Sequence, residues 1–458
     1  MKSKQDLTVG NINKKLWVFA IPLMLGNVMQ QFYNLVDTWV VGKYIGDNAL
    51  AAVGSSYSLM TFLTSVILGL CLGSSAFFSI TFGEKNIKRL KNGMFISFVM
   101  IGIFSLILTF ASFYLCGRIM KILQVPYDIQ GIMSEYLKWI FVGIFATFLY
   151  NYFSNLLRGI GNSVIPLAFL CVSVILNIGL DLYFVLVLKQ GIRGAAIATL
   201  TARILEFLIV SIYIFCIDKR LNFKPKHLFL FDKIFALDLF QHGLPVFINE
   251  VMWSLGVSAQ AAILGHIKYS AGDPVAANSI ASMVQQLSTV VIFGIANAAG
   301  IIIGKSIGSG KIERAKVEAK TLKYLSYVIG VIACGVILLL KNFVINFYTI
   351  PPETKALANE LMVTIAFITI FVSVSSVTIV GILRGGGDTR FCMVAEIITL
   401  WCVATPLALI GSLLRLPVPL VLILMKSDEP LKSLVAVIRI NKNKWIKSLA
   451  RDFNREEV

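Results

Sequence analysis

The sequence has little charge for its length, and acidic residues are especially scarce. Only 14% of its 458 residues are charged, whereas soluble domains carry about 25%. Asp and Glu number 24, against 41 Lys and Arg. Hydrophobic residues make up 57% of the chain, and the mean hydropathy is +0.82. This composition excludes an ordinary soluble domain and favours a membrane protein.

Residues for metal, disulfide or catalytic chemistry are also few. The 7 Cys stand singly, mostly inside apolar stretches, and form no C-x-x-C pair. Buried free thiols pack as small hydrophobes, so we expect neither disulfides nor a zinc site. The 3 His are scattered at His227, His242 and His266. Without a His, Cys or Ser-His constellation, we expect no enzymatic activity and no cofactor.

The net charge of +17 would suit nucleic acid, but the positions of the charges argue against that partner. Most Lys and Arg fall in alternate loops and in the two tails, which is the positive-inside pattern of membrane proteins. We therefore expect a multi-pass protein in the lipid bilayer, with both termini in the cytoplasm and no nucleic-acid partner. The basic C-terminal tail either lies on the anionic inner leaflet or anchors the topology.

Apolar runs of about 20 residues or more recur along the chain, each able to cross a bilayer of ~30 Å as a helix. The first contains Gln30, Gln31 and Asn34 and lacks a small-x-small cleavage site, so we interpret it as a helix and not a signal peptide. The last is the weakest, because it is interrupted by Lys426, Asp428, Glu429 and Pro430. The predicted helices, six in each half, span 15–42, 52–80, 93–116, 130–157, 164–188, 192–216, 238–266, 276–304, 324–348, 356–383, 391–414 and 417–438.

The second half of the chain repeats the first. The segment Leu157-Arg158-Gly159-Ile160-Gly161-Asn162-Ser163 returns as Leu383-Arg384-Gly385-Gly386-Gly387-Asp388-Thr389, and Pro22 returns as Pro245. A repeat this long is one structural unit used twice. Because each unit has an even number of helices, the two are related by a pseudo-two-fold axis along the membrane normal. The predicted all-α fold has an N-terminal lobe (1–216), a basic cytoplasmic linker (217–237), a C-terminal lobe (238–440) and a basic tail (441–458).

The repeated segment is expected in the cytoplasmic turn that follows the fourth and the tenth helix. Its glycines, Gly159, Gly161, Gly385 and Gly387, permit a tight backbone turn. We expect Arg158 and Arg384 to bond the last helix carbonyls and complement the helix dipole. A phosphate-binding loop is the less favoured interpretation.

The two halves differ in their buried charges, which are costly in a membrane and usually functional. Asp37 in the first helix and Asp181 in the fifth align with Gln260 and Leu407, so the acids occur only in the first half. At about 1.5 Å per residue, both acids lie roughly 9–12 Å outward of the midplane. One polar cluster at this height can hold Tyr33, Asp37, Tyr136, Asn177, Asp181 and Thr199.

Two carboxylates close together in a low dielectric cannot both stay ionised cheaply, so one takes up a proton or a cation binds between them. We expect this cluster to couple transport to H⁺ or Na⁺, with a Na⁺ held by Asp37, Asn177 and Asp181. Pro22 removes a helix hydrogen bond and gives the first helix a place to bend. The alternative is that hydroxyls and amides satisfy the acids, which then only pack helices together.

Other polar residues are candidates for a substrate cleft between the lobes. Glu250 in the seventh helix either binds a cationic group there or is a packing acid. We expect Arg203 and Glu206 to pair with each other, and Glu396 to lie at the membrane interface. The neutral candidates, which either bond a ligand or join helices, are Gln30, Gln31, Asn151, Gln260 and Gln285.

Together these residues resemble the multidrug and toxic compound extrusion (MATE) family over about residues 8–450. The resemblance implies two six-helix lobes around a V-shaped cleft. It also implies export of small organic compounds, often cationic and amphipathic, in exchange for H⁺ or Na⁺ by alternating access. The segments that carry it are Pro22 with Gln30-Gln31-Phe32-Tyr33-Asn34-Leu35-Val36-Asp37, Ala49-Leu50-Ala51-Ala52-Val53-Gly54, the two Leu-Arg-Gly segments, Asn177-Ile178-Gly179-Leu180-Asp181 and Gly191-Ile192-Arg193-Gly194-Ala195-Ala196-Ile197-Ala198-Thr199.

Within the family, the acidic pair resembles the DinF-type prokaryotic branch, which implies a monomer in the cytoplasmic membrane. That branch implies the same six-residue ion site, with Asn151 nearer the drug cleft and Pro22 as the bending point. NorM-type members place a functional Glu in the seventh helix, nearly one turn beyond Glu250. The alternative function is a lipid-linked oligosaccharide or lipid flippase, which would favour several basic residues in the cleft; Arg203 alone offers itself.

Overall fold

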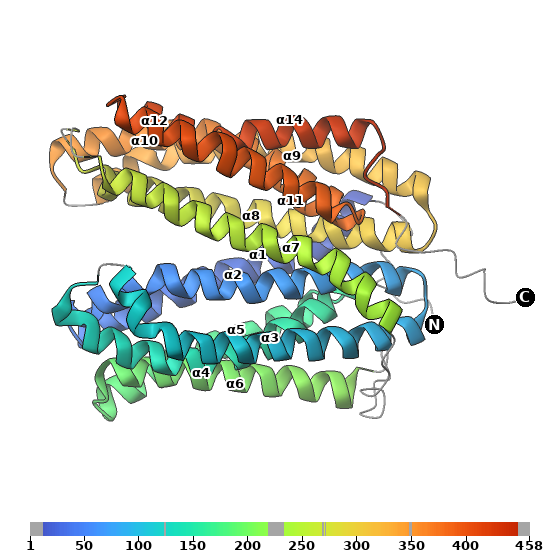
Figure 1. Ribbon diagram of the computed structural model, residues 1–458, viewed down its shortest axis with the longest axis horizontal. Coiled ribbons are helices and arrows are strands. Elements are labelled where there is room, and N and C mark those ends of the chain that lie inside the picture. Colours follow the sequence, from blue (N-terminus) through green and yellow to red (C-terminus); the bar gives the residue numbers. More distant parts are fainter. Residues whose placement is uncertain are drawn as a thin grey trace, which may run out of the picture. The chain divides into compact units, whose positions relative to one another are not determined.

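The computed structural model describes residues 12–122, 125–218, 233–267, 270, 272–347 and 350–447. Most of the predicted linker and of the predicted tail, together with His227, lie outside the described residues. The described chain is built of helices joined by short turns (Figure 1). Several helices continue into π-helical segments, which carry the symbol η.

The first half contains α1 (Ile12–Tyr44), α2 (Asp47–Gly83), α3 (Ile87–Ile122), α4 (Tyr127–Gly159), α5 (Val164–Leu182), η1 (Tyr183–Val187), α6 (Gly191–Ile212) and η2 (Tyr213–Ile217). The second half contains α7 (Lys233–Gly265), α8 (Pro274–Gly308), α9 (Ile312–Phe347), α10 (Pro352–Ser375), η4 (Ser376–Leu383), α11 (Thr389–Ile397), η5 (Ile398–Ala404), α12 (Thr405–Leu413), α13 (Val418–Met425) and α14 (Asp428–Asn441). Joined end to end, these elements form the twelve predicted helices.

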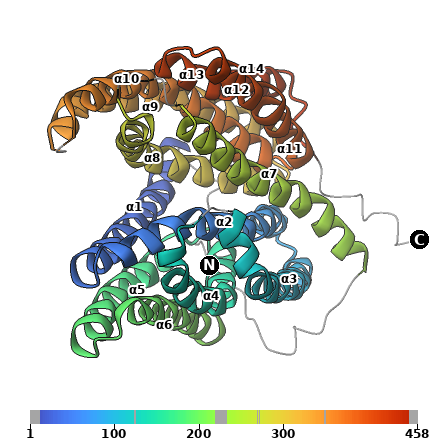
Figure 2. The same ribbon diagram turned by 60° about the vertical axis from the view of Figure 1, so that its left-hand side comes forward.

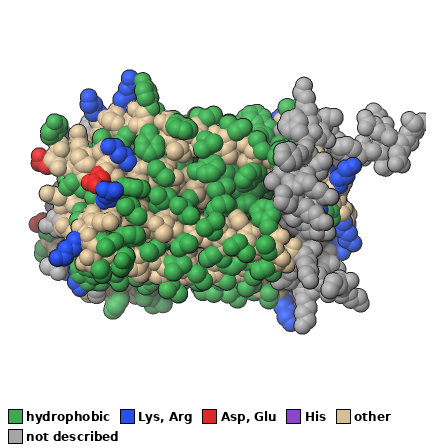
Figure 3. Space-filling model, turned by 90° about the horizontal axis from the view of Figure 1, so that it is seen from below, with side chains coloured by type: hydrophobic (Ala, Val, Ile, Leu, Met, Phe, Trp, Pro, Cys, Tyr) green, Lys and Arg blue, Asp and Glu red, His purple; other side chains and the backbone are tan. Residues whose placement is uncertain are grey.

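Ten helices in the described part of the chain are long and apolar enough to cross a membrane. The other two predicted spans are the polar helix α1 and the broken pair α13 and α14. The chain is therefore a multi-pass membrane protein, as its composition predicted. Large apolar side chains remain exposed within each half, among them Phe110, Ile175 and Leu339, and hydrophobic side chains cover much of the face shown in Figure 3.

Most helices extend a few residues beyond their predicted bounds, and two of the differences have clear local reasons. The ninth begins at Ile312 and not at 324, because its basic first turns are held by the ion pair between Arg314 and Glu318 at 2.8 Å. The twelfth is broken between Met425 and Asp428. Pro430 then falls in the first turn of α14, where a missing N–H costs no helix hydrogen bond. The acids Asp428 and Glu429 also stand at the helix N-terminus, where the helix dipole favours negative charge.

By its contacts the chain divides into two compact units. The N unit is Leu25–Phe247, and the C unit is Met1–Met24 together with Ile248–Val458. Both boundaries fall inside a helix, shortly after Pro22 in α1 and Pro245 in α7. These units differ from the repeat-based lobes, because the first part of α1 packs in the C unit: a Cβ on Gly294 of α8 would overlap Met24.

Within the N unit, α4 packs against both α2 and α6, and α3 and α5 complete the bundle (Figure 2). Its core contains aromatic side chains that are almost fully buried, including Tyr136, Phe141, Phe148 and Tyr152. Within the C unit, α8 packs against α9, α10 and η4. After α14 the chain returns to the repeated turn, where the Lys447 amide donates to the Gly386 carbonyl at 3.0 Å.

The repeated turn has the same backbone in both halves. Gly161 and Gly387 have φ values of 90 and 86 degrees, in the left-handed region that favours glycine. The next amide donates back to the helix in each case, from Asn162 to the Leu157 carbonyl at 2.8 Å and from Asp388 to the Leu383 carbonyl at 3.0 Å. This is the bonding of a Schellman helix end. The predicted tight turn is confirmed at both places.

Candidate functional site

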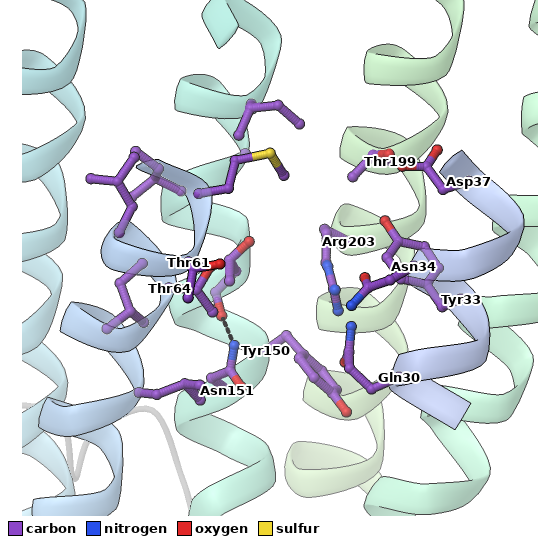
Figure 4. A pocket seen from close by; sticks show the side chains of 18 of the residues that line it. Gln30, Tyr33, Asn34, Asp37, Thr61, Thr64, Tyr150, Asn151, Thr199 and Arg203 are labelled. Atoms are coloured by element: carbon purple, nitrogen blue, oxygen red, sulfur yellow. Dashed lines mark hydrogen bonds between the residues drawn. The ribbon is translucent and has the colours of Figure 1, made fainter. Parts of the chain in front are cut away.

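A cavity of about 420 Å³ lies within the N unit among α1, α2, α4 and α6 (Figure 4). Small-molecule sites typically measure about 300–1,000 Å³ and combine apolar walls with a few polar groups. Apolar walls come from Met60, Trp139, Ile140 and Leu200. The polar and charged lining comprises Asn27, Gln30, Tyr33, Asn34, Asp37, Thr38, Tyr57, Thr61, Thr64, Ser65, Tyr136, Thr147, Tyr150, Asn151, Arg158, Thr199 and Arg203.

Helical spacing explains why these side chains meet. Gln30, Tyr33, Asn34 and Asp37 are three or four residues apart on α1 and therefore share one face. Figure 4 shows this face of α1 turned toward α6, with Thr199 beside Asp37. The opposite wall carries Thr61 and Thr64 of α2 with Tyr150 and Asn151 of α4.

The predicted ion cluster assembles at one wall of this cavity. Tyr33, Asp37, Tyr136 and Thr199 line it. Asp37 and Asp181 are close enough to interact electrostatically. The Tyr136 hydroxyl is close enough to Asp37 and Asp181 to interact electrostatically with both. The Tyr33 hydroxyl interacts with the same two acids and is within hydrogen-bonding distance of Thr199. Asn177 and Asp181, one turn apart on α5, are 0% exposed and lie outside the cavity lining.

Several polar atoms of this cluster are buried without a hydrogen-bond partner among the described residues. They are Oδ1 of Asp37, both carboxylate oxygens of Asp181 and both amide atoms of Asn177. Buried polar groups in proteins are nearly always paired, and an unpaired buried charge is costly. The oxygens among these atoms therefore fit a proton or a small cation, whereas the Asn177 amide nitrogen can only donate. The packing-only alternative needs hydroxyl or amide partners, which the described side chains do not provide to these atoms.

Arg203 adds a feature that the sequence only partly predicted. Its guanidinium lies over the Tyr33 ring at 5.3 Å and lines the cavity. It also forms the predicted pair with Glu206 at 2.9 Å, and that Glu side chain is 0% exposed. The sequence offered Arg203 only as a basic residue for the cleft of a flippase; its place in this cavity follows from α6, where it is one helical turn after Thr199 and on the same face.

The arginines of the repeated turn do not act as predicted. Arg384 donates to Glu250 at 2.8 Å and is nearly buried, so it neutralises that acid instead of bonding helix carbonyls. A buried guanidinium needs a counter-charge, and α7 supplies it. Glu250 therefore already has a cationic partner within the C unit. Arg158 lines the N-unit cavity, where it interacts with Tyr150 and Glu206.

The neutral cleft candidates separate into three groups. Gln30 and Asn151 line the N-unit cavity, and the Asn151 amide donates to the Thr147 carbonyl at 2.8 Å. Gln260 is buried in the C unit, where it donates to the Met425 carbonyl at 2.9 Å and accepts from Lys426 at 3.0 Å. Gln260 thus joins α7 to the end of α13. The remaining two, Gln31 and Gln285, are half-buried outside the cavity lining.

Residues 22–183 and 245–410 both match the family model MatE, so the two halves match it separately. The chain belongs to the MatE family. Its MatE relatives include two Bacillus subtilis (strain 168) proteins described as probable multidrug resistance proteins. YoeA is 26% identical over 406 residues, which cover 87% of each chain. YpnP is 28% identical over 418 residues, which cover 89% of this chain and 90% of the relative.

A solved structure described as MATE in the bent conformation resembles the MatE chain with a TM-score of 0.86 at 20% identity. The match covers 97% of this chain and 99% of that one. This likeness confirms the predicted all-α MATE fold with twelve helices in two lobes. The assignment to the DinF-type branch stays a prediction.

Proposed function

We propose that this MatE protein is a secondary active antiporter. It exports small organic compounds across the cytoplasmic membrane of a prokaryote in exchange for H⁺ or Na⁺. One observation carries the proposal: Asp37, at the wall of a cavity of small-molecule size, and Asp181, buried behind that wall, are close enough to interact, and both have unpaired oxygens. Ion and compound would then compete for one stretch of α1.

The exchange of the ion for the organic compound follows from the charge of the cavity wall. When a proton or Na⁺ is bound between Asp37 and Asp181, the cavity wall loses negative charge and a cationic compound is held less tightly. When the ion leaves, the charge returns and the compound binds. Because a ligand shifts a conformational equilibrium only by its differential affinity, this competition is what drives alternating access.

The lining supports substrates that are amphipathic and often cationic. Trp139, Leu200 and the flexible Met60 offer apolar surface that adapts to different shapes. The charge of Arg203 is balanced by Glu206, so it does not oppose a bound cation. A lipid-linked oligosaccharide flippase, by contrast, would need uncompensated cations for pyrophosphate. The names of YoeA and YpnP agree with an exporter of drug-like compounds.

The hinge of this mechanism would be Pro22. The division into contact units falls two residues later, inside the continuous helix α1. Proline removes a helix hydrogen bond and crowds the preceding turn. We propose that α1 bends there when the ion at Asp37 is exchanged, and that the monomer carries out the whole cycle.

Replacing the acids tests the proposal. We expect Asp37→Asn and Asp181→Asn each to abolish ethidium efflux driven by an ion gradient while leaving expression intact. The matched control is Asp128→Asn, an exposed acid in the first turn of α4, which should export at the wild-type rate. Full efflux in both acid variants, measured in inverted vesicles, would remove the coupling site from the account.

The coupling ion is assigned by supplying one gradient at a time. A carboxylate and amide cluster suits either H⁺ or Na⁺. Vesicles with a proton gradient and no Na⁺ should export fully if the ion is H⁺ and should be inactive if it is Na⁺. Export that needs neither gradient would contradict the antiport mechanism.

A further inference from the structure

A second buried group of charges lies in the C unit, around Lys432 of α14. Its ammonium contacts Glu396 of α11 at 3.2 Å, Asp428 at 2.9 Å and Glu429 at 2.7 Å. The side chains of Lys432 and Asp428 are each 5% exposed and that of Glu396 is 7% exposed. Glu396, which we expected at the membrane interface, is buried within the C unit, where α14 brings it a counter-charge.

The charges of this group, which we call the Lys432 cluster, do not balance. If all are ionised, three carboxylates face one ammonium. Neighbouring cations do not make up the difference. Arg384 interacts with Glu396 but is bonded to Glu250 at 2.8 Å.

The other charged neighbours are occupied as well. Arg439, which lies about two turns beyond Lys432 on α14, pairs with Asp388 at 2.8 Å. Lys426, just before α14, donates to Gln260. The element α10 contributes a neutral group, the Ser375 hydroxyl, which contacts Oε2 of Glu429. An excess of negative charge therefore stays within the cluster, and burying it is costly.

The contacts of Lys432 show which carboxylate oxygen of the cluster lacks a partner. The Lys432 ammonium donates hydrogen bonds to Glu396 and Glu429, whereas its contact with Oδ2 of Asp428 at 2.9 Å is an ion pair. The other oxygen of Asp428, Oδ1, is buried and has no partner among the described residues. The cluster therefore contains more acceptor oxygens than Lys432 satisfies.

A proton suits this cluster better than a metal ion. The Lys432 ammonium already occupies the point where the three carboxylates converge, and it would repel a second cation. In the part of the chain that the structure describes, no group of three or more His, Cys, Asp or Glu residues is arranged to hold a metal ion.

We propose that Glu396, Asp428, Glu429 and Lys432 form a proton-binding site in the C unit, separate from the acids Asp37 and Asp181. A carboxylate oxygen of the cluster gains one proton from water, Lys432 stays an ammonium, and the excess negative charge falls by one. Glu396 is the acceptor, because its contact with Lys432, at 3.2 Å, is the longest of the three.

The position of the site gives proton binding a structural consequence. The link between Glu396 and Lys432 joins α11 to α14, and neutral Glu396 would hold Lys432 less strongly. Two π-helical segments begin beside the cluster, η4 directly after Ser375 and η5 two residues after Glu396. π-helical turns are frequent at functional sites, where a helix must adjust its register. Proton binding would thus loosen α14 from α11.

Infrared spectroscopy tests this site without any transport. The full-length protein in lipid nanodiscs is titrated with acid, and the carbonyl stretch of protonated carboxyl groups is recorded. We expect Glu396→Gln to lose part of this signal, and Asp428→Asn, which removes one negative charge from beside Glu396, to shift the titration to lower pH. Glu313→Gln, which removes an acid with an 85% exposed side chain from α9, should keep the wild-type titration. Wild-type titration in both cluster variants would overturn the proposal.

Thermal unfolding gives a second readout that does not depend on assigning a spectrum. A group that is protonated in the folded protein and ionised in the unfolded chain makes stability fall as pH rises. Glu396→Gln should flatten this dependence relative to Glu313→Gln, and Lys432→Gln should steepen it. Equal pH dependence in all three variants would contradict proton binding, whatever the outcome of the efflux tests on Asp37.

Discussion

Single buried charges account for most of what distinguishes this chain, because each must find a partner inside the protein. Asp37 and Asp181 leave oxygens unpaired, which is what a site for an exchangeable ion requires. Glu206 is fully buried but is balanced by Arg203. In the C unit, the Lys432 cluster, which includes the unpaired Oδ1 of Asp428, is a candidate for proton uptake.

We expect Glu206 to raise the affinity of the cavity for cationic compounds. Glu206→Gln would leave the Arg203 guanidinium uncompensated at the cavity wall. We expect ethidium to bind the purified variant about tenfold more weakly, which corresponds to ~1.4 kcal/mol. The double variant Arg203→Gln/Glu206→Gln should bind as the wild type does. Unchanged affinity in the single variant would show that this pair does not act on the bound compound.

Glu250 is expected to be structural. Removing one partner of a buried ion pair costs about 3–5 kcal/mol, because the other charge is left alone. Glu250→Gln should therefore lower the unfolding temperature clearly, and the added Arg384→Met substitution should restore part of the loss. If Glu250→Gln unfolds as the wild type does but fails to export, Glu250 contacts the substrate instead.

At the scale of elements, the repeated turns depend on glycine for close packing as well as for φ. A Cβ on Gly385 would lie 2.6 Å from the Gly300 carbonyl oxygen of α8. Overpacking of this kind typically costs about 1–3 kcal/mol, so Gly385→Ala should be destabilised by that amount in a denaturant titration. Gly335→Ala on α9, where nothing lies within 4 Å, should be neutral or slightly stabilised. Equal stability of the two would contradict the close packing.

Pro22 is the element-scale test of bending in α1. Pro22→Ala restores a hydrogen bond and raises helix propensity by about 3 kcal/mol, so α1 should become stiffer. We expect ethidium still to bind while efflux falls. Wild-type efflux in this variant would show that the cycle does not need a bend at Pro22.

The helices could largely be predicted because apolar run length and flanking charge determine them locally. The meeting of the acids with their polar neighbours could be predicted as well, since spacing along α1, α5 and α6 places these residues on common faces, and their role in ion binding stays a prediction. The Lys432 cluster could not be predicted from the sequence, because it joins Glu396 of α11 to residues of α14, and periodicity carries no information on such pairings. For the same reason, the partner of Arg384 was misjudged.

For the whole molecule, duplication supplies two units with the same turns and different acids. The N unit contains a cavity and an acidic pair, and the C unit contains the Lys432 cluster. Both contact boundaries fall just after a helix proline, so each unit ends inside a helix and not at a loop. Each boundary therefore lies within a continuous helix, α1 or α7.

The central claim is that Asp37 and Asp181 couple export to an ion gradient. It is tested most directly by ethidium efflux in proteoliposomes, with the H⁺ and Na⁺ gradients imposed one at a time on wild type, Asp37→Asn and Asp181→Asn. The account predicts that one gradient drives export by the wild type and that neither gradient drives it in either variant. Gradient-driven export at the wild-type rate in both variants would contradict it.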